Sequence, residues 1–275
     1  MVTLTNLGLV FVAGLLTALA TGLGALPFFL VDDIGDRWNV ALWGVASGIM
    51  VSASVFGLIQ EGLAVVDGTL VDAAAAIGPG VLAGVALVVV AHEVLEGAEL
   101  DPKEYAEADF KKLVLILGIL TVHSFPEGVA VGVSFAELGI DDPSLATVSL
   151  AGLTLPVLAV FMTVAISIHN VPEGVAISIP LRGMGVGEWR MVWWAVFSSL
   201  PQPVGAVLAY YFVTLAEQFL PFGFGFAAGA MVYLVLTEFV PEALEYGRGL
   251  PGKGHRELVG GLTAGVLVMV PLAFL

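Results

Sequence analysis

Two nearly identical polar hexapeptides stand inside long apolar stretches: HSFPEG at residues 123–128 and HNVPEG at residues 169–174. In each, a histidine precedes a glutamate by four residues, so the two side chains share one face of a helix. Two such helices facing each other would bring four nitrogen and oxygen donors together. Such donors suit Zn²⁺ and similar divalent ions, whose charge offsets the burial of two carboxylates. The four candidate ligands are His123, Glu127, His169 and Glu173.

The composition indicates that a lipid bilayer surrounds these motifs. Of the 275 residues, 59% are hydrophobic and only 12% charged, and the mean hydropathy is +1.01. A soluble helical bundle would need amphipathic periodicity, which stretches such as VLAGVALVVVA (81–91) lack. We therefore expect an all-α integral membrane protein with a single transmembrane domain over residues 1–275. Its eight spans are predicted at about 6–30, 39–60, 76–97, 112–136, 149–180, 191–215, 221–243 and 257–275.

The basic residues predict the orientation of these spans. All 9 lysines and arginines fall in odd-numbered loops: Arg37 in the first, Lys103, Lys111 and Lys112 in the third, Arg182 and Arg190 in the fifth, and Arg248, Lys253 and Arg256 in the seventh. Because positive loops stay in the cytoplasm, both termini are expected outside. We expect a multi-pass protein of the cell membrane.

Both hexapeptides are predicted at the same depth. Counted from the nearest basic residue at ~1.5 Å per residue, they overlap the middle of a hydrocarbon core of ~30 Å. Ionisable residues at this depth are functional by default. Pro126 and Pro172 each free one helix carbonyl, and Gly128 and Gly174 permit close packing or bending. One metal ion would thus receive half its ligands from each of two antiparallel helices.

Other classes of function lack support in the sequence. There is no cysteine, so no thiolate metal site is available, and a formal charge of −15 argues against nucleic acid as a partner. A zinc-protease H-E-x-x-H is absent, since HEVLE at 92–96 lacks the second histidine. An intramembrane metal-binding enzyme and a metal sensor stay open as alternatives. No prosthetic group is expected, only a transported or bound ion: Zn²⁺, or Cd²⁺, Fe²⁺ or Mn²⁺.

HSFPEGVAVG (123–132) and HNVPEGVAISIPL (169–181) resemble the fourth and fifth helices of the ZIP family of divalent metal transporters, in its prokaryotic, GufA-like branch. Residues 14–27, 198–210 and 227–243 resemble its first, sixth and seventh helices. The resemblance implies movement of zinc or a related ion into the cytoplasm. It also implies a 3+2+3 arrangement of helices with inverted repeats, and a homodimer in some relatives.

The resemblance further implies a second metal position beside the first. It would share the two glutamates and add Ser124, Asn170 and Gln202. Many relatives have Asn at the first of these three positions and Glu at the third. The second site therefore keeps oxygen donors here but loses charge, and we expect it to be weak or empty.

A further polar group is predicted near the cytoplasmic face. His92 and Glu96 close the third span, and Glu238 and Glu242 close the seventh. These four residues are candidates for a metal release route. Solvation of two helix ends is the alternative, although the seventh-helix resemblance favours a role for Glu238.

Overall fold

The computed structural model describes residues 3–31, 33–96, 107–138, 146–150 and 152–271. The α-helices are α1 (Leu4–Leu23), α2 (Asp36–Ser52), α3 (Gln60–Ala64), α4 (Leu70–Glu96), α5 (Glu107–Ser134), α6 (Val157–Gly183), α7 (Glu188–Ser198), α8 (Pro201–Leu215), α9 (Leu220–Leu234), α10 (Val240–Tyr246) and α11 (His255–Met269). Short 3₁₀ turns are η1 (Leu26–Phe29), η3 (Glu217–Phe219), η5 (Gly247–Gly249) and η6 (Pro251–Gly254). Two π-helical turns, η2 (Ala53–Ile59) and η4 (Val235–Phe239), continue α2 into α3 and α9 into α10.

The described residues are mostly helical, as expected of an all-α membrane protein, but a short β-hairpin precedes α6. Strands β1 (Thr147–Leu150) and β2 (Leu153–Pro156) pair as an antiparallel hairpin. Thr147, Val148 and Thr154 are β-branched and favour strands, while Gly152 adopts φ +81° in the turn. The fifth predicted span therefore starts at Val157 rather than at residue 149.

Among the described residues, six helical segments are long and apolar enough to cross a membrane: Leu4–Phe29, Asp36–Ala64, Leu70–Val94, Val157–Gly183, Glu188–Leu215 and Glu217–Gly249. Large apolar side chains on them face outward, including Phe56, Leu82, Trp193 and Leu236, each more than half exposed. Soluble proteins rarely expose so much apolar surface to water, so this is a multi-pass membrane protein. The fourth and eighth predicted spans correspond to α5 and α11.

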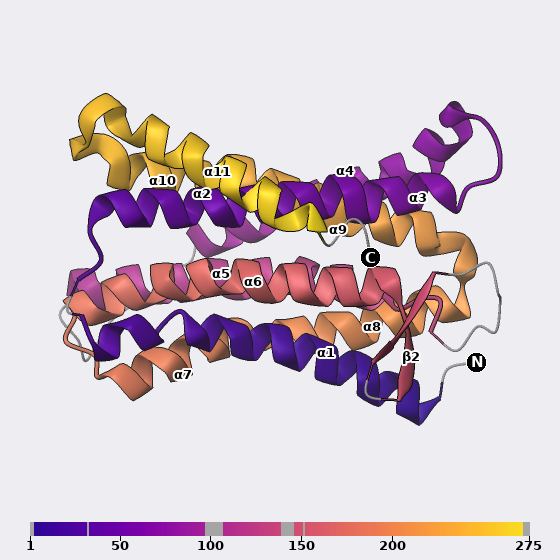
Figure 1. The fold of residues 1–275 in the computed structure, drawn as a ribbon, viewed down its shortest axis with the longest axis horizontal. Helices are drawn as coiled ribbons and strands as arrows, with labels where there is room; N and C mark the ends of the chain where they lie inside the picture. The colour runs from indigo at the N-terminus through magenta and orange to yellow at the C-terminus, as the bar shows by residue number, and fades with distance from the viewer. Residues whose placement is uncertain (1–2, 32, 97–106, 139–145, 151, 272–275) are drawn as a thin grey trace.

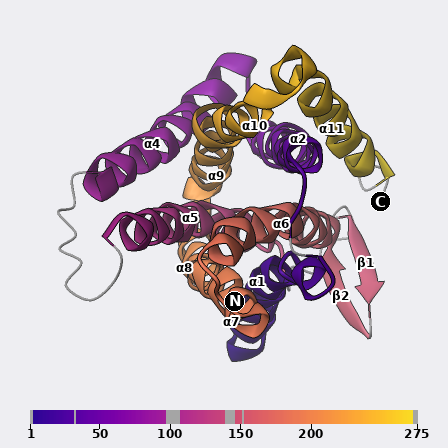
Figure 2. The same ribbon diagram turned by 90° about the vertical axis from the view of Figure 1, so that its left-hand side faces the viewer.

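Helices α5 and α6 lie side by side at the centre of the molecule (Figures 1 and 2). On one side of them lie α1, α7 and α8, and on the other lie α2, α4, α9, α10 and α11. The junctions η1–α2, α6–α7 and α10–α11 gather at one end of the bundle (Figure 1), which we call the basic end because Arg37, Arg182, Arg190, Arg248 and Arg256 belong to these segments. The N-terminus and the hairpin lie at the opposite end.

Glycines allow the outer helices to pack backbone to backbone. A Cβ on Gly44 or Gly48 of α2 would meet the backbone of α11, and one on Gly80 or Gly84 of α4 would meet that of α9. The partner helices present glycines of their own at the same spacing: Gly261 and Gly265 on α11, and Gly225 and Gly229 on α9. Small residues spaced in this way hold helices together where lipid supplies no hydrophobic drive.

These two helix pairs belong to an internal repeat. One constant sequence separation relates Gly44, Gly48, Met50 and Val51 to Gly225, Gly229, Met231 and Val232, and also relates Gly80 and Gly84 to Gly261 and Gly265. The same separation places η2 on η4. Because α2 starts at the basic end and α9 at the opposite end, the two copies run in opposite directions (Figure 1). In the same repeat the end of α1 corresponds to the start of α8. The contact of α1 with α6 therefore has its counterpart in the contact of α8 with α5.

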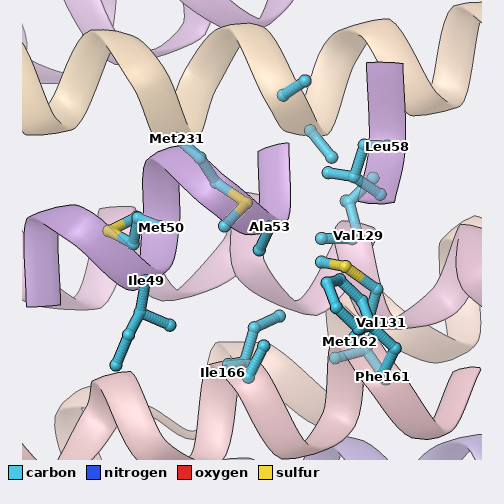
Figure 3. Packing of buried hydrophobic residues seen from close by; sticks show 14 of the residues in the cluster. Ile49, Met50, Ala53, Leu58, Val129, Val131, Phe161, Met162, Ile166 and Met231 are labelled. Atoms are coloured by element: carbon cyan, nitrogen blue, oxygen red, sulfur yellow. The ribbon is translucent and has the colours of Figure 1, made fainter. Parts of the chain in front are cut away.

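An apolar cluster fills the space between α5–α6 and the helices beside them. Met50, Ala53 and Leu58 of α2 and η2 belong to it, as do Phe161 and Met162 of α6 (Figure 3). Val129 and Val131 of α5, Ile166 of α6 and Met231 of α9 complete this part of the cluster. Along α5 and α6, these residues lie on the side of the hexapeptides away from the basic end. Apolar packing therefore closes that side.

The packing of α11 on α2 makes a prediction about two adjacent glycines. Gly261→Ala should destabilise the protein by roughly 1–3 kcal/mol, because the new Cβ would collide with the Ala41 carbonyl. Gly260→Ala is the matched control: its Cβ meets open space, and alanine favours a helix over glycine by about 1 kcal/mol. Thermal unfolding of both variants in detergent would compare them. Equal melting temperatures would contradict the close approach.

Candidate metal centre

Three of the four predicted ligands form one compact group. Nε2 of His169 lies 3.0 Å from Oε1 of Glu127 and 3.9 Å from Oε2 of Glu173. One ligand atom from each of the three residues lies within 4.8 Å of the other two. The two glutamates come from different helices, α5 and α6, as the antiparallel arrangement of the hexapeptides requires. This spacing allows one ion to contact all three side chains.

The group is fully buried and incompletely satisfied. Glu127, His169 and Glu173 each have 0% exposure. Neither carboxylate oxygen of Glu173 has a hydrogen-bond partner, and Nδ1 of His169 also lacks one. Two buried carboxylates without a positive partner are very costly, and buried polar atoms are normally hydrogen-bonded. A divalent cation at this point would satisfy these atoms and supply the missing charge.

The two hexapeptides reach this position because α5 and α6 run on through their prolines. Pro126 and Pro172 lie inside uninterrupted helices. The glycine that ends each motif approaches an outer helix closely: a Cβ on Gly128 would collide with the backbone of Gln202, and one on Gly174 with the carbonyl of Thr21. The prediction that these glycines permit close packing is confirmed.

His123, the fourth predicted ligand, lies outside the compact group although it is buried. Its exposure is 2%, and its Nδ1 has no hydrogen-bond partner. It stands one helical turn before Glu127, towards the basic end, within electrostatic reach of His169 and His92. His123 therefore lies next to the three-residue group, between that group and the basic end.

The three residues predicted for a second metal are all fully buried around Glu127. Gln202, in the first turn of α8, donates from Nε2 to Oε2 of Glu127 at 2.6 Å. Asn170 donates from Nδ2 to the Thr17 carbonyl at 2.7 Å and to Oε1 of Gln202 at 3.1 Å. Ser124 lies beside His123 on α5. Asn170 and Gln202 thus already engage protein atoms.

Two of the four residues predicted for a release route meet. Nδ1 of His92 on α4 lies 3.0 Å from Oε1 of Glu238 on η4, with both side chains partly exposed. Glu242 follows one turn later on α10 and is exposed. Glu96 ends α4, and its side chain lies outside the described residues. A polar pair therefore stands on the basic-end side of His123.

Two aromatic residues that the sequence did not single out support His169. The ring of Phe239 stacks on the imidazole at a centroid distance of 5.5 Å, and Trp43 packs edge-on against Phe239 at 4.8 Å. Phe239 belongs to η4, the same π-helical turn that carries Glu238, and such turns are frequent at functional sites. The signal that could have revealed them is the internal repeat, in which η4 matches η2.

The fold and this buried group together define a class of protein, a multi-pass helical membrane protein with a candidate metal-binding centre midway along its helices. Comparison with known proteins narrows that class. A family model described as ZIP Zinc transporter matches residues 152–273.

Two bacterial relatives match nearly the whole chain. The zinc transporter GufA of Myxococcus xanthus is 31% identical over 97% of this chain and 98% of its own length. The zinc transporter ZupT of Corynebacterium aurimucosum is 30% identical over 97% of this chain and 96% of its own length. The chain therefore belongs to the ZIP family, in the branch that includes GufA and ZupT.

A protein of Arabidopsis thaliana named for zinc transport is 38% identical over 83% of this chain, but the chain spans only 33% of that protein's length. These relatives are named as transporters, and the family is one of transporters rather than of enzymes. The alternative of an intramembrane enzyme is therefore set aside.

The unpartnered carboxylate of Glu173 makes a prediction about metal binding. Glu173→Gln should weaken Zn²⁺ binding by more than about 100-fold, because loss of a ligand should exceed the 10–100-fold cost of losing an outer partner. Ser178→Ala is the control, since the Ser178 hydroxyl only donates to the Gly174 carbonyl on the same helix. Calorimetric titration of the purified protein measures both. Unchanged affinity in Glu173→Gln would remove this residue from the centre.

Proposed function

We propose that the protein moves zinc, or a related divalent transition-metal ion, into the cytoplasm through a His/Glu site on α5 and α6. The observation that carries this proposal is the buried group of Glu127, His169 and Glu173 on two central helices. The zinc-transporter names of GufA and ZupT support zinc as the cargo. In this proposal His123, which stands one helical turn from the group, moves in as a fourth ligand when the ion binds, and two imidazoles suit Zn²⁺ or Cd²⁺ better than Mn²⁺.

The proposed topology has eight spans within a single domain of residues 1–275. It adds α5 and α11 to the six long apolar segments. The 3+2+3 arrangement is supported by the inverted repeat of α2–α4 in α9–α11 around the central α5 and α6. We place the basic end in the cytoplasm and both termini outside, in a cell membrane. A homodimer is consistent with the family.

The proposed direction agrees with where polar residues stand. From the three-residue group, His123 leads towards the pair of His92 and Glu238 and then Glu242 at the basic end. In the other direction an ion meets the apolar cluster around Leu58, Phe161 and Met162. Titratable side chains among the described residues thus continue from the group towards the basic end, which favours release to the cytoplasm after a separate entry step. Solvation of the helix ends is the competing role for these polar residues.

The topology is testable because the chain contains no cysteine of its own. Asp67→Cys, between α3 and α4, should react with a membrane-impermeant maleimide on intact cells. Gly249→Cys, in the loop before α11, should react only after the cells are permeabilised. Both positions are exposed, so a difference in labelling reports the side of the membrane. The opposite labelling pattern would reverse the proposed orientation.

Transport is testable in proteoliposomes that enclose a zinc-sensitive dye. Addition of Zn²⁺ outside should raise the signal with wild-type protein, and Glu127→Ala and His169→Ala should each remove that rise. Ser178→Ala, which leaves the group intact, is the control. Tight zinc binding without flux would favour the sensor alternative. Flux that survives both substitutions would place the path away from α5 and α6.

A further inference from the structure

A chain of hydrogen bonds runs across four helices and ends on Glu127. It starts at the carbonyl of Thr17 on α1, which accepts from Nδ2 of Asn170 on α6 at 2.7 Å. The same Nδ2 donates to Oε1 of Gln202 on α8 at 3.1 Å. Nε2 of Gln202 then donates to Oε2 of Glu127 on α5 at 2.6 Å. All four residues have 0% exposure, so these contacts are shielded from bulk water.

The carbonyl of Thr17 determines which atom is the donor and which the acceptor in every bond of this hydrogen-bond network. A backbone carbonyl can only accept, so Asn170 must turn its NH₂ group towards Thr17. Gln202 must then present its oxygen to Asn170 and its NH₂ group to Glu127. A carboxylate accepts such a bond strongly, because one partner is charged. The amide of Gln202 is thereby committed as a donor to Glu127.

We infer that Gln202 and Asn170 are positioning residues rather than metal ligands, and that they limit the centre to one ion. The Gln202 N–H holds Oε2 of Glu127 and leaves Oε1, 3.0 Å from Nε2 of His169, for the ion. A second cation bound to Oε2 would meet the positive end of the N–H dipole. This inference rests on the proposed function only in taking Glu127, His169 and Glu173 as the ligands of the cargo ion.

The charge of the site supports a single ion. Glu127 and Glu173 bring two negative charges, which match one divalent cation, and Asn170 and Gln202 add none. A second dication would leave two uncompensated positive charges in a buried site, which is very costly. A carboxylate at position 202 would reduce that excess and would replace the N–H donor with a third anionic ligand.

The internal repeat shows that the two glutamates are held differently. The constant separation that relates the repeats places Thr21 of α1 opposite Gln202 of α8. Thr21, however, bonds through its hydroxyl to Ser199 at 2.8 Å, and both oxygens of Glu173 lack a hydrogen-bond partner. Glu127 is therefore the fixed ligand, with one oxygen bound by protein, and Glu173 is the ligand left entirely to the ion.

The first test counts bound ions. Purified full-length protein, stripped with a chelator and dialysed against Zn²⁺, should bind one ion per chain. Gln202→Glu should bind two. Gln202→Leu should still bind one, but about 10–100-fold more weakly, as expected when a partner of a ligand is lost. Ser199→Ala, which removes a buried hydrogen bond to Thr21 that does not belong to this hydrogen-bond network, should bind one ion with unchanged affinity.

Misfolding cannot explain a second bound ion in Gln202→Glu, because a misfolded protein would bind fewer ions rather than more. A second ion in the wild type that disappears in Gln202→Leu would make Gln202 a ligand and overturn the inference. A count that stays at one in Gln202→Glu, with the variant folded and binding, would also overturn it. Absence of any saturable ion in the wild type would instead be a failure of the proposed function.

A double-mutant cycle tests the serial arrangement by a separate measurement. Asn170→Leu breaks the chain without touching Glu127, so it should weaken binding of the single ion as Gln202→Leu does. The variant with both substitutions should lose no more than Gln202→Leu alone, because residues within one network are not additive. Additive losses from the two substitutions would overturn the claim that Asn170 acts through Gln202.

Discussion

The rest of the structure depends on one electrostatic constraint: two carboxylates are buried in the middle of an apolar bundle. Glu127 and Glu173 have no exposed surface, and in the described structure Glu173 has no hydrogen-bond donor. Burial of an unpaired charge is prohibitively costly, whereas a bound dication cancels both charges at once. The proposed ion would therefore remove the energetic cost of burying these two carboxylates. A carrier must also release its cargo, so some of the negative charge must find other partners when the ion leaves.

The glycine contacts explain how helices can be brought this close to two carboxylates. Gly128 and Gly174 let the central helices approach the backbones of Gln202 and Thr21, which lie at equivalent positions of the two repeats. That symmetry alone would make the two glutamates equal. The difference between an amide at Gln202 and a hydroxyl at Thr21 makes them unequal, because the amide donates to Glu127 whereas the hydroxyl bonds to Ser199. The backbone around the two glutamates is thus nearly twofold symmetric, and the different side chains at Thr21 and Gln202 break that symmetry.

The sequence predicted those features that depend on local pattern. The spacing of His and Glu in the hexapeptides predicted a shared site on two helices, and three of the four residues meet. The polar helix ends predicted a group that includes the pair of His92 and Glu238. The hairpin before α6 was missed because its residues are as apolar as a span. The donor role of Gln202 and the stacking of Phe239 on His169 were missed because they depend on tertiary contacts. The internal repeat was visible in the sequence and would have linked Gln202 to Thr21.

The residues between the candidate centre and one end of the molecule differ from those between the centre and the other end. Along the proposed release route towards the basic end, His123, His92 and Glu238 would offer successive ligands to an ion. Towards the opposite end, Leu58 and Phe161 belong to a packed apolar cluster (Figure 3). A fixed pore would need polar surface on both sides, so the proposed import requires this cluster to separate. Closely packed interfaces of this kind switch between discrete arrangements rather than deform continuously. Inverted repeats supply such a second arrangement, because exchanging the contacts of the two copies opens the other end. We therefore favour alternating access for the proposed transport cycle.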